Sequence, residues 1–218
     1  MASATAMAAA LVLAGCGSDG GQAATPGQGA TAPGFPLPGA LAAGSPTVSP
    51  VPTPTGPVIH GAVNDKVRFA AQIVSVGTST ALPKVPTPAG KTMVLVRLRV
   101  TSDPVDHTML APPKEEWSIT YPGCTSGSAC VGADGESRFL PESAVRSGVT
   151  GGAAAVTLGE TLAANTFYFT YIWKAVPVDA DLSKAELCAA RLPGPDECTP
   201  LGPVTPLTDV NSLDLKAF

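Results

Sequence analysis

Apolar and polar residues alternate along several stretches of this chain, which is the pattern of half-buried β-strands. The clearest stretch is residues 91–102 (KTMVLVRLRVTS), and residues 66–76 (KVRFAAQIVSV) are β-branched and partly alternating. In the first stretch one face carries Val94, Val96, Leu98 and Val100, and the other carries Arg97 and Arg99. We expect the valine and leucine face to pack into a core.

Residues 165–176 (NTFYFTYIWKAV) form a third strand with two apolar faces. One face is an aromatic stripe of Phe167, Phe169, Tyr171 and Trp173, and we expect this face to line the core. The opposite face carries Tyr168, Thr170, Ile172 and Lys174 and is less polar than a solvated face. If it is exposed, it marks a partner or ligand site. The candidate interaction residues are therefore Tyr168 and Ile172, together with Trp117 in a short predicted strand at residues 116–121.

Shorter segments complete a β-rich pattern. Residues 116–121, 137–140 and 185–190 are further strand candidates, while residues 180–190 are also the best helical candidate. Asp134-Gly135 is a hairpin signal, and the connections are rich in Pro and Gly. Strands without helical crossovers predict an all-β fold, an antiparallel β-sandwich.

The N-terminal segment ends in an isolated cysteine. Residues 6–15 are apolar and uncharged, too short to span a bilayer but of the length of a signal-peptide core. The sequence Leu13-Ala14-Gly15-Cys16 resembles the bacterial lipobox, in which the chain is cut before the cysteine and the thiol is lipidated. The alternative is a core helix with a buried free cysteine. No Lys or Arg precedes Lys66, and a start codon upstream of Met1 would supply the usual basic residues.

A Pro/Gly-rich segment follows the predicted lipid site. Residues 17–57 hold nine Pro, nine Gly and a single charged residue, Asp19. Such a composition cannot bury enough apolar surface to offset its ordering entropy. We therefore expect a signal peptide at 1–15, a lipidated Cys16 with a disordered tether at 16–57, and one β-sandwich domain at 58–218.

Charge excludes one class of partner. The chain carries 13 Lys and Arg against 17 Asp and Glu, for a net charge of −4. No basic stripe with interleaved aromatic residues is present, which argues against nucleic-acid binding. No second hydrophobic stretch reaches membrane-spanning length.

Four cysteines remain after Cys16 is assigned to lipid. Their even number in an exported domain indicates disulfides, for which three connectivities exist. We favour the local pairs Cys124–Cys130 and Cys188–Cys198, because both loops contain residues that allow a turn. Their spacings do not fit a four-cysteine zinc site.

The order of these parts resembles bacterial surface lipoproteins that carry a telokin-like, immunoglobulin-like domain of unknown function. The matching pieces are KTMVLVRLRVTS, the turn Leu158-Gly159-Glu160-Thr161 and the strand FYFTYIWKAVP. Ser102-Asp103 replaces the family's usual Asn, and the two cysteine loops are additions. The resemblance covers roughly residues 60–190 and implies an immunoglobulin-like fold and a surface location, but no activity.

Candidate chemistry is sparse. Gly90-Lys91-Thr92 lacks the upstream glycine of a phosphate-binding loop, since Val85 occupies that position. His107 has Asp103 and Asp106 nearby, but no nucleophile motif accompanies them. His107 and Met109 form an H-x-M that would suit Cu(I). Asp134 and Glu136, and the pair Asp103 and Asp106, lack the spacing of a calcium loop and are expected to be solvated. We expect no cofactor and no catalytic residue.

These observations favour a non-enzymatic lipoprotein, anchored by Cys16 on the extracellular face of the cell membrane, that acts through protein or cell-envelope contacts. The alternative is an extracytoplasmic carrier of a small apolar ligand or metal ion. A cavity between the sheets would favour the carrier, and an exposed patch would favour the binding module. A hydrolase built on His107 is the third possibility.

Overall fold

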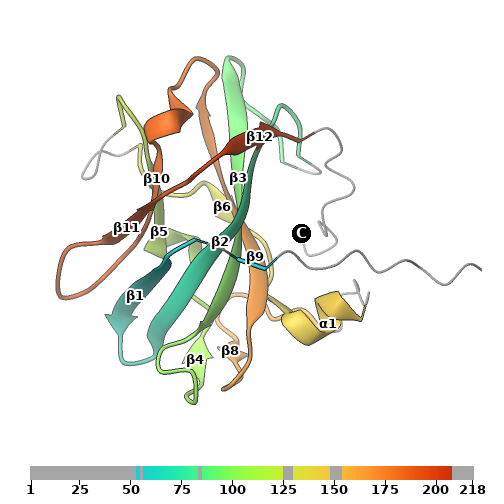
Figure 1. The fold of residues 1–218 in the computed structure, drawn as a ribbon, viewed down its shortest axis with the longest axis vertical. Helices are drawn as coiled ribbons and strands as arrows, with labels where there is room; N and C mark the ends of the chain where they lie inside the picture. The colour runs from blue at the N-terminus through green and yellow to red at the C-terminus, as the bar shows by residue number, and fades with distance from the viewer. Residues whose placement is uncertain (1–52, 55, 83–84, 125–129, 148–153, 208–218) are drawn as a thin grey trace, which may run out of the picture. The chain divides into compact units, whose positions relative to one another are not determined.

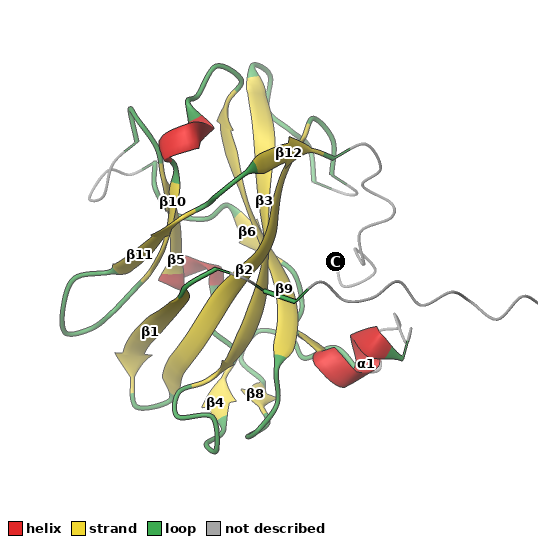
Figure 2. Cartoon of the chain, viewed as in Figure 1, coloured by secondary structure: helices red, strands yellow, loops and turns green. Residues whose placement is uncertain are grey.

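The structure is a computed structural model that describes residues 53–54, 56–82, 85–124, 130–147 and 154–207. The predicted signal peptide, Cys16 and most of the predicted tether lie outside these residues. The described part is mostly antiparallel β-structure with very little helix, as the pattern predicts (Figure 2). None of its helices is long and apolar enough to cross a membrane.

A seven-stranded sheet is built on three long strands. Its main order is β1-β2-β3-β9-β6, with neighbours antiparallel, and two short strands extend it (Figure 1). Its strands are β1 (Val58–Asn64), β2 (Val67–Ser79), β3 (Lys91–Ser102), β6 (Gly135–Glu136), β7 (Leu140–Pro141), β9 (Tyr168–Pro177) and β12 (Val204–Pro206). Only β12 runs parallel to its neighbour, β2.

A second sheet of three strands shares its core with the first. It has the order β11-β10-β5, and a two-stranded ladder joins β4 to β8. The bounds are β4 (Met109–Leu110), β5 (Trp117–Thr120), β8 (Thr161–Leu162), β10 (Glu186–Ala189) and β11 (Glu197–Pro200). Short helical turns are η1 (Lys114–Glu116), α1 (Glu142–Arg146) and η2 (Leu182–Lys184).

The main core confirms the prediction for residues 91–102, which form β3. Val94, Val96, Leu98 and Val100 are completely buried in the cluster that includes Trp117, Ile119 and Leu187 from the small sheet. The other face of β3 is covered as well. Met93 and Leu95 pack in a second cluster, and Arg99 forms an ion pair of 2.8 Å with Glu142 of α1.

The faces of β9 are the reverse of the prediction. Tyr168 and Ile172 belong to the main core, whereas Phe169 and Trp173 pack in the two smaller clusters on the outer face. There α1, Leu82 and the arginines of β3 cover the aromatic stripe, with the Arg97 guanidinium 4.9 Å from the Phe169 ring centre. Because both faces are apolar, period-2 alternation alone does not identify the core side.

One local prediction is wrong, and for residues 180–190 the structure confirms the strand candidate at 185–190 and not the helical one. Asp134-Gly135 does not turn a hairpin, because Gly135 pairs with Trp173 of the distant strand β9. A Cβ on Gly135 would lie 2.2 Å from the Trp173 ring, so the glycine permits close packing of that ring. Residues 180–190 are not a helix. They form the single turn η2 and then β10, whose Leu187 and Ala189 point into the core.

Candidate functional site

The predicted interaction residues do not form a surface. Trp117, Tyr168 and Ile172 are 1%, 3% and 0% exposed and all pack in the main core. The Trp117 ring lies against Phe69, with the ring centres 4.7 Å apart. The prediction of an exposed patch at these residues is therefore corrected: Trp117 of the small sheet and Tyr168 and Ile172 of the large sheet lie in the core that the two sheets share.

The residues of the histidine-based candidate sites also do not lie together. His107 is an exposed loop residue whose Nδ1 lies 2.8 Å from the Asp106 carboxylate, and this hydrogen bond lowers the pKa of Asp106. Met109 is buried in the core, so His107 and Met109 do not face a common ligand position. Asp103 instead pairs with the other histidine, His60, at 2.9 Å.

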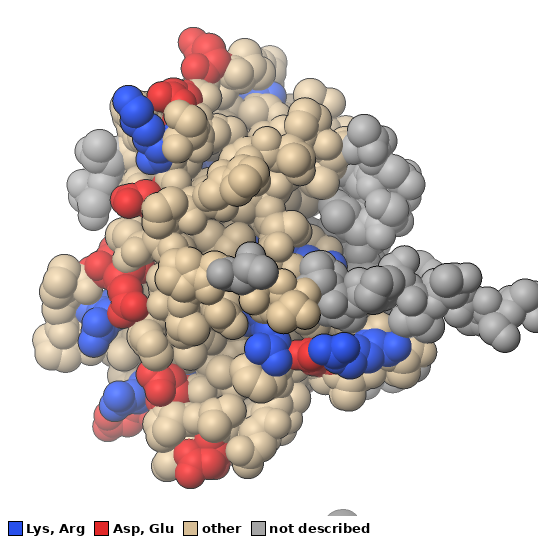
Figure 3. All heavy atoms as spheres, viewed as in Figure 1, with Lys and Arg blue, Asp and Glu red and all other residues tan. Residues whose placement is uncertain are grey.

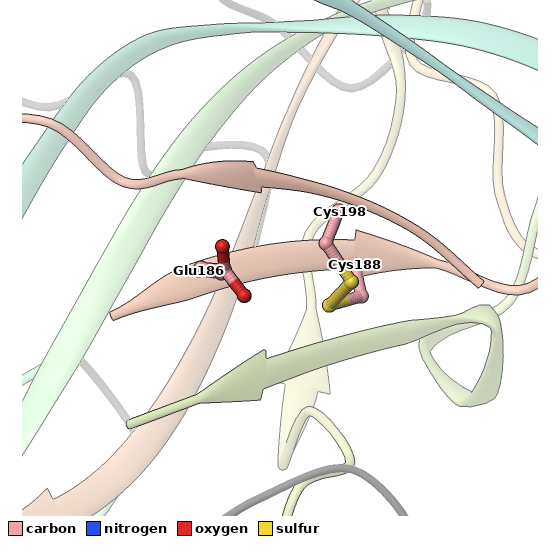
Figure 4. Close-up of side chains that lie close together, drawn as sticks. All are labelled: Glu186, Cys188 and Cys198. Carbon is pink, nitrogen blue, oxygen red and sulfur yellow. A yellow bond between two sulfur atoms is a disulfide. The ribbon is translucent and has the colours of Figure 1, made fainter. Parts of the chain in front are cut away.

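Both predicted disulfides are present. Cys124 is bonded to Cys130, and Cys188 is bonded to Cys198. The second bridge joins residues directly opposite each other on β10 and β11. Glu186 lies beside it, with its carboxylate and both sulfurs within 4.8 Å of one another (Figure 4). Because the sulfurs are bonded to each other, neither is a thiolate ligand, and the oxidised group offers a metal one carboxylate.

An uncharged surface flanks β12. On one side, β1 pairs with β2 as far as Gln72 and β12 begins to pair at Val76, which leaves a hollow of about 420 Å³ beside residues 73–75. On the other side lies a shallower hollow of about 700 Å³. The two hollows share Gly202 and Pro203, and neither is lined by an ionisable residue. We call this surface the uncharged face.

Hydroxyl groups and small apolar side chains make up the uncharged face. Its hydroxyl residues are Ser75, Thr78, Thr80, Thr92, Ser183, Thr199 and Thr205. Thr199 is 2% exposed, and its hydroxyl has no hydrogen-bond partner within the described residues. In Figure 3 no charged side chain is visible on the surface over β12. Such a surface suits a partner without net charge at the contact.

A third hollow differs because it holds charge. It has a volume of about 390 Å³ and lies between the start of β3, the end of β9 and residues 130–134. Lys174, Lys91 and Asp134 line it together with Met93 and Trp173. The sequence analysis did not predict this pocket. The one feature that could have indicated it is Lys174, a lysine on the face of β9 that otherwise carries Tyr168 and Ile172.

Glu136 was expected to be a solvated loop carboxylate, but its side chain is partly buried. Burial raises its pKa to about 7, the neighbouring Glu115 adds to this effect, and Lys114 opposes it. Its Oε2 atom is buried without a hydrogen-bond partner among the described residues. The protonated form of Glu136 is therefore favoured in the folded domain.

This geometry predicts a pH-dependent stability. The carboxyl ionises near pH 4.5 when unfolded and near 7 when folded, so the free energy of unfolding falls as the pH rises between these values and is level above them. Glu136→Gln should therefore raise the melting temperature at pH 8 by about 3 °C, or ~1 kcal/mol, and by almost nothing at pH 4. Solvent screening of this part-exposed group keeps the gain below the full effect of the pKa shift.

Thermal denaturation followed by circular dichroism at both pH values measures this effect. Glu186→Gln at an exposed position is the control and should change stability by less than ~0.5 kcal/mol. An equal effect of Glu136→Gln at pH 4 and pH 8 would contradict the prediction.

No family model, curated protein or solved structure matches this chain.

Proposed function

We propose that this protein is a lipid-anchored extracytoplasmic lipoprotein that acts by binding and not by catalysis. Its domain is an immunoglobulin-like β-sandwich, held by lipid on Cys16 and a Pro/Gly-rich tether on the outer face of the cell membrane. Two disulfides and two sheets with a common core support the domain assignment. The lipobox-like Leu13-Ala14-Gly15-Cys16 supports the anchor.

The observation that carries the binding role is the uncharged face beside β12. Two adjoining hollows without an ionisable lining residue form a surface that a partner can cover without desolvating charge. The partner that fits is a cell-envelope protein whose contact surface is small, neutral and rich in hydrogen-bonding groups. The exposed hydroxyl groups of Thr80 and Thr205 offer such a partner polar contacts.

A carrier that holds an apolar ligand between the sheets, or a metal at the H-x-M loop, has less support. The two sheets share a continuous core of fully buried side chains, including Leu98, Ile119 and Leu187, and the hollows described above lie around it. The H-x-M loop gives no joint ligand position, because Met109 is buried and His107 is exposed.

One experiment tests both the anchor and the face. Cys16→Ser should move the full-length protein from the membrane fraction to the soluble fraction of the source cell. Thr80→Glu and Thr205→Glu place a charge on either side of β12 and should leave the protein in the membrane fraction, but reduce crosslinking to its envelope partner at least tenfold. Membrane fractionation and crosslinking with mass spectrometry measure the two effects.

Thr108→Glu is the matched control, since Thr108 is exposed and precedes β4, far along the chain from β12. It should retain both the membrane fraction and the partner. Equal crosslinking in all three glutamate variants would contradict the assignment of the face, and membrane retention of Cys16→Ser would contradict the anchor.

A further inference from the structure

The pocket beside Lys174 has an apolar wall and a charged end. Met93 and Trp173 belong to one buried hydrophobic cluster, and Pro86 and Pro88 extend the wall. Its volume of about 390 Å³ falls within the range of small-molecule sites. The pocket can therefore enclose the body of a small apolar molecule.

The charged end is made by a buried ammonium group. Lys174 is 4% exposed, and its Nζ donates to the Gly132 carbonyl at 2.6 Å. An ammonium has three N–H donors, and Gly132 is the one acceptor that the described part of the chain gives it. Burial lowers the pKa of Lys174, the Asp134 charge opposes this shift, and Lys91 adds to it. A buried cation with unused donors is stabilised by an anion placed next to it.

The charges around the pocket limit the ligand to a monoanion. Lys91 and Lys174 bring two positive charges, and Asp134 brings one negative charge. The Asp134 carboxylate is already engaged, because its Oδ2 accepts the Ala175 amide at 2.6 Å. The remaining charge of +1 matches one carboxylate, and the apolar wall matches a hydrocarbon body.

We propose that this pocket binds a small monocarboxylate with an apolar body, whose carboxylate pairs with Lys174 and whose body packs against Met93 and Trp173. This inference goes beyond the proposed function. The pocket shares no lining residue with the uncharged face, so either site can fail without the other.

Benzoate and its neutral analogue benzamide are the probes. We expect the oxidised protein to bind benzoate at least tenfold more tightly than benzamide, measured by isothermal titration calorimetry. Trp173 lines the pocket and the chain has one other tryptophan, the core residue Trp117. Benzoate should therefore also change the tryptophan fluorescence, and a Trp117→Phe background assigns that change to Trp173.

Three variants separate a binding role from a structural one. Lys174→Met should weaken benzoate binding at least tenfold, and the exposed Lys91→Met, which cannot disturb the core, should weaken it about threefold. Asp134→Asn removes the opposing charge and should strengthen benzoate binding about threefold, while leaving benzamide unchanged. Lys66→Met, an exposed lysine outside the pocket, is the control and should leave both affinities as they are.

A purely structural Lys174 predicts different results. Equal binding of benzoate and benzamide, no saturable binding of benzoate, or benzoate affinities unchanged by both Lys91→Met and Asp134→Asn would each overturn the proposal. The last two variants keep the test decisive even if Lys174→Met fails to fold.

Discussion

Trp117→Ala is expected to lower the free energy of unfolding by about 3–5 kcal/mol, the usual cost of removing a large buried aromatic side chain. Trp117 is 1% exposed and packs against Phe69 between the two sheets. The cavity cannot close easily, because Phe69 lies in the large sheet and Trp117 in the small sheet, and each is held by its own strand hydrogen bonds. Guanidinium denaturation of the oxidised protein measures the loss.

Leu158→Ala is the matched control, since Leu158 is 56% exposed. It should cost less than ~0.5 kcal/mol. If Trp117→Ala left stability within 1 kcal/mol of the native protein and removed partner crosslinking instead, Trp117 would be a surface residue and the burial described here would be wrong.

Gly61→Ala should lower the free energy of unfolding by about 2–3 kcal/mol, through overpacking of the core. Gly61 lies directly opposite Phe69 in the β1–β2 pair. A Cβ at this position would lie 2.0 Å from the Phe69 ring, and that ring is fully buried against Trp117. The added methyl group therefore displaces an aromatic ring that has no free space to enter. Chemical denaturation measures the change.

Gly132→Ala tests the same chemical change without the clash, because no atom lies within 4 Å of the added Cβ. It should alter stability by less than ~0.5 kcal/mol. The double variant Gly61→Ala/Phe69→Leu should lose less free energy of unfolding than the two single variants lose together, since the smaller side chain makes room for the methyl group. Additive losses would show that the clash with Phe69 is not the cause.

The alternation predicts the buried face of a strand correctly where the other face is clearly more polar. In β3 the two arginines fix the orientation, and the structure buries Val94, Val96, Leu98 and Val100 as expected. In β9 both faces are apolar, so the sequence could not show that α1 and Leu82 cover the aromatic stripe. The exposed patch predicted at Tyr168 and Ile172 failed for this reason.

The candidate sites could be predicted from the sequence less well than the fold. The uncharged face depends on β12, which joins β2 from more than 100 residues away, and strand pairing of that kind has no local signal. The sequence around Glu136 predicts a solvated loop carboxylate. In the structure Glu136 pairs with Ile172 of β9, and its Oε2 atom is buried. The two disulfides were predicted correctly because short loops bring their own ends together.

The all-β character, the two local disulfides and the orientation of β3 follow from the order of residues alone, because they depend on alternation and short loops within the chain. The side of β9 that faces the core and the residues that form the Lys174 pocket became known only from the packed domain. The pocket joins Lys91, Asp134 and Lys174 from three separate segments. Such a meeting is set by long-range strand pairing and by the burial of both faces of the large sheet, and these are properties of the packed domain and not of any one segment.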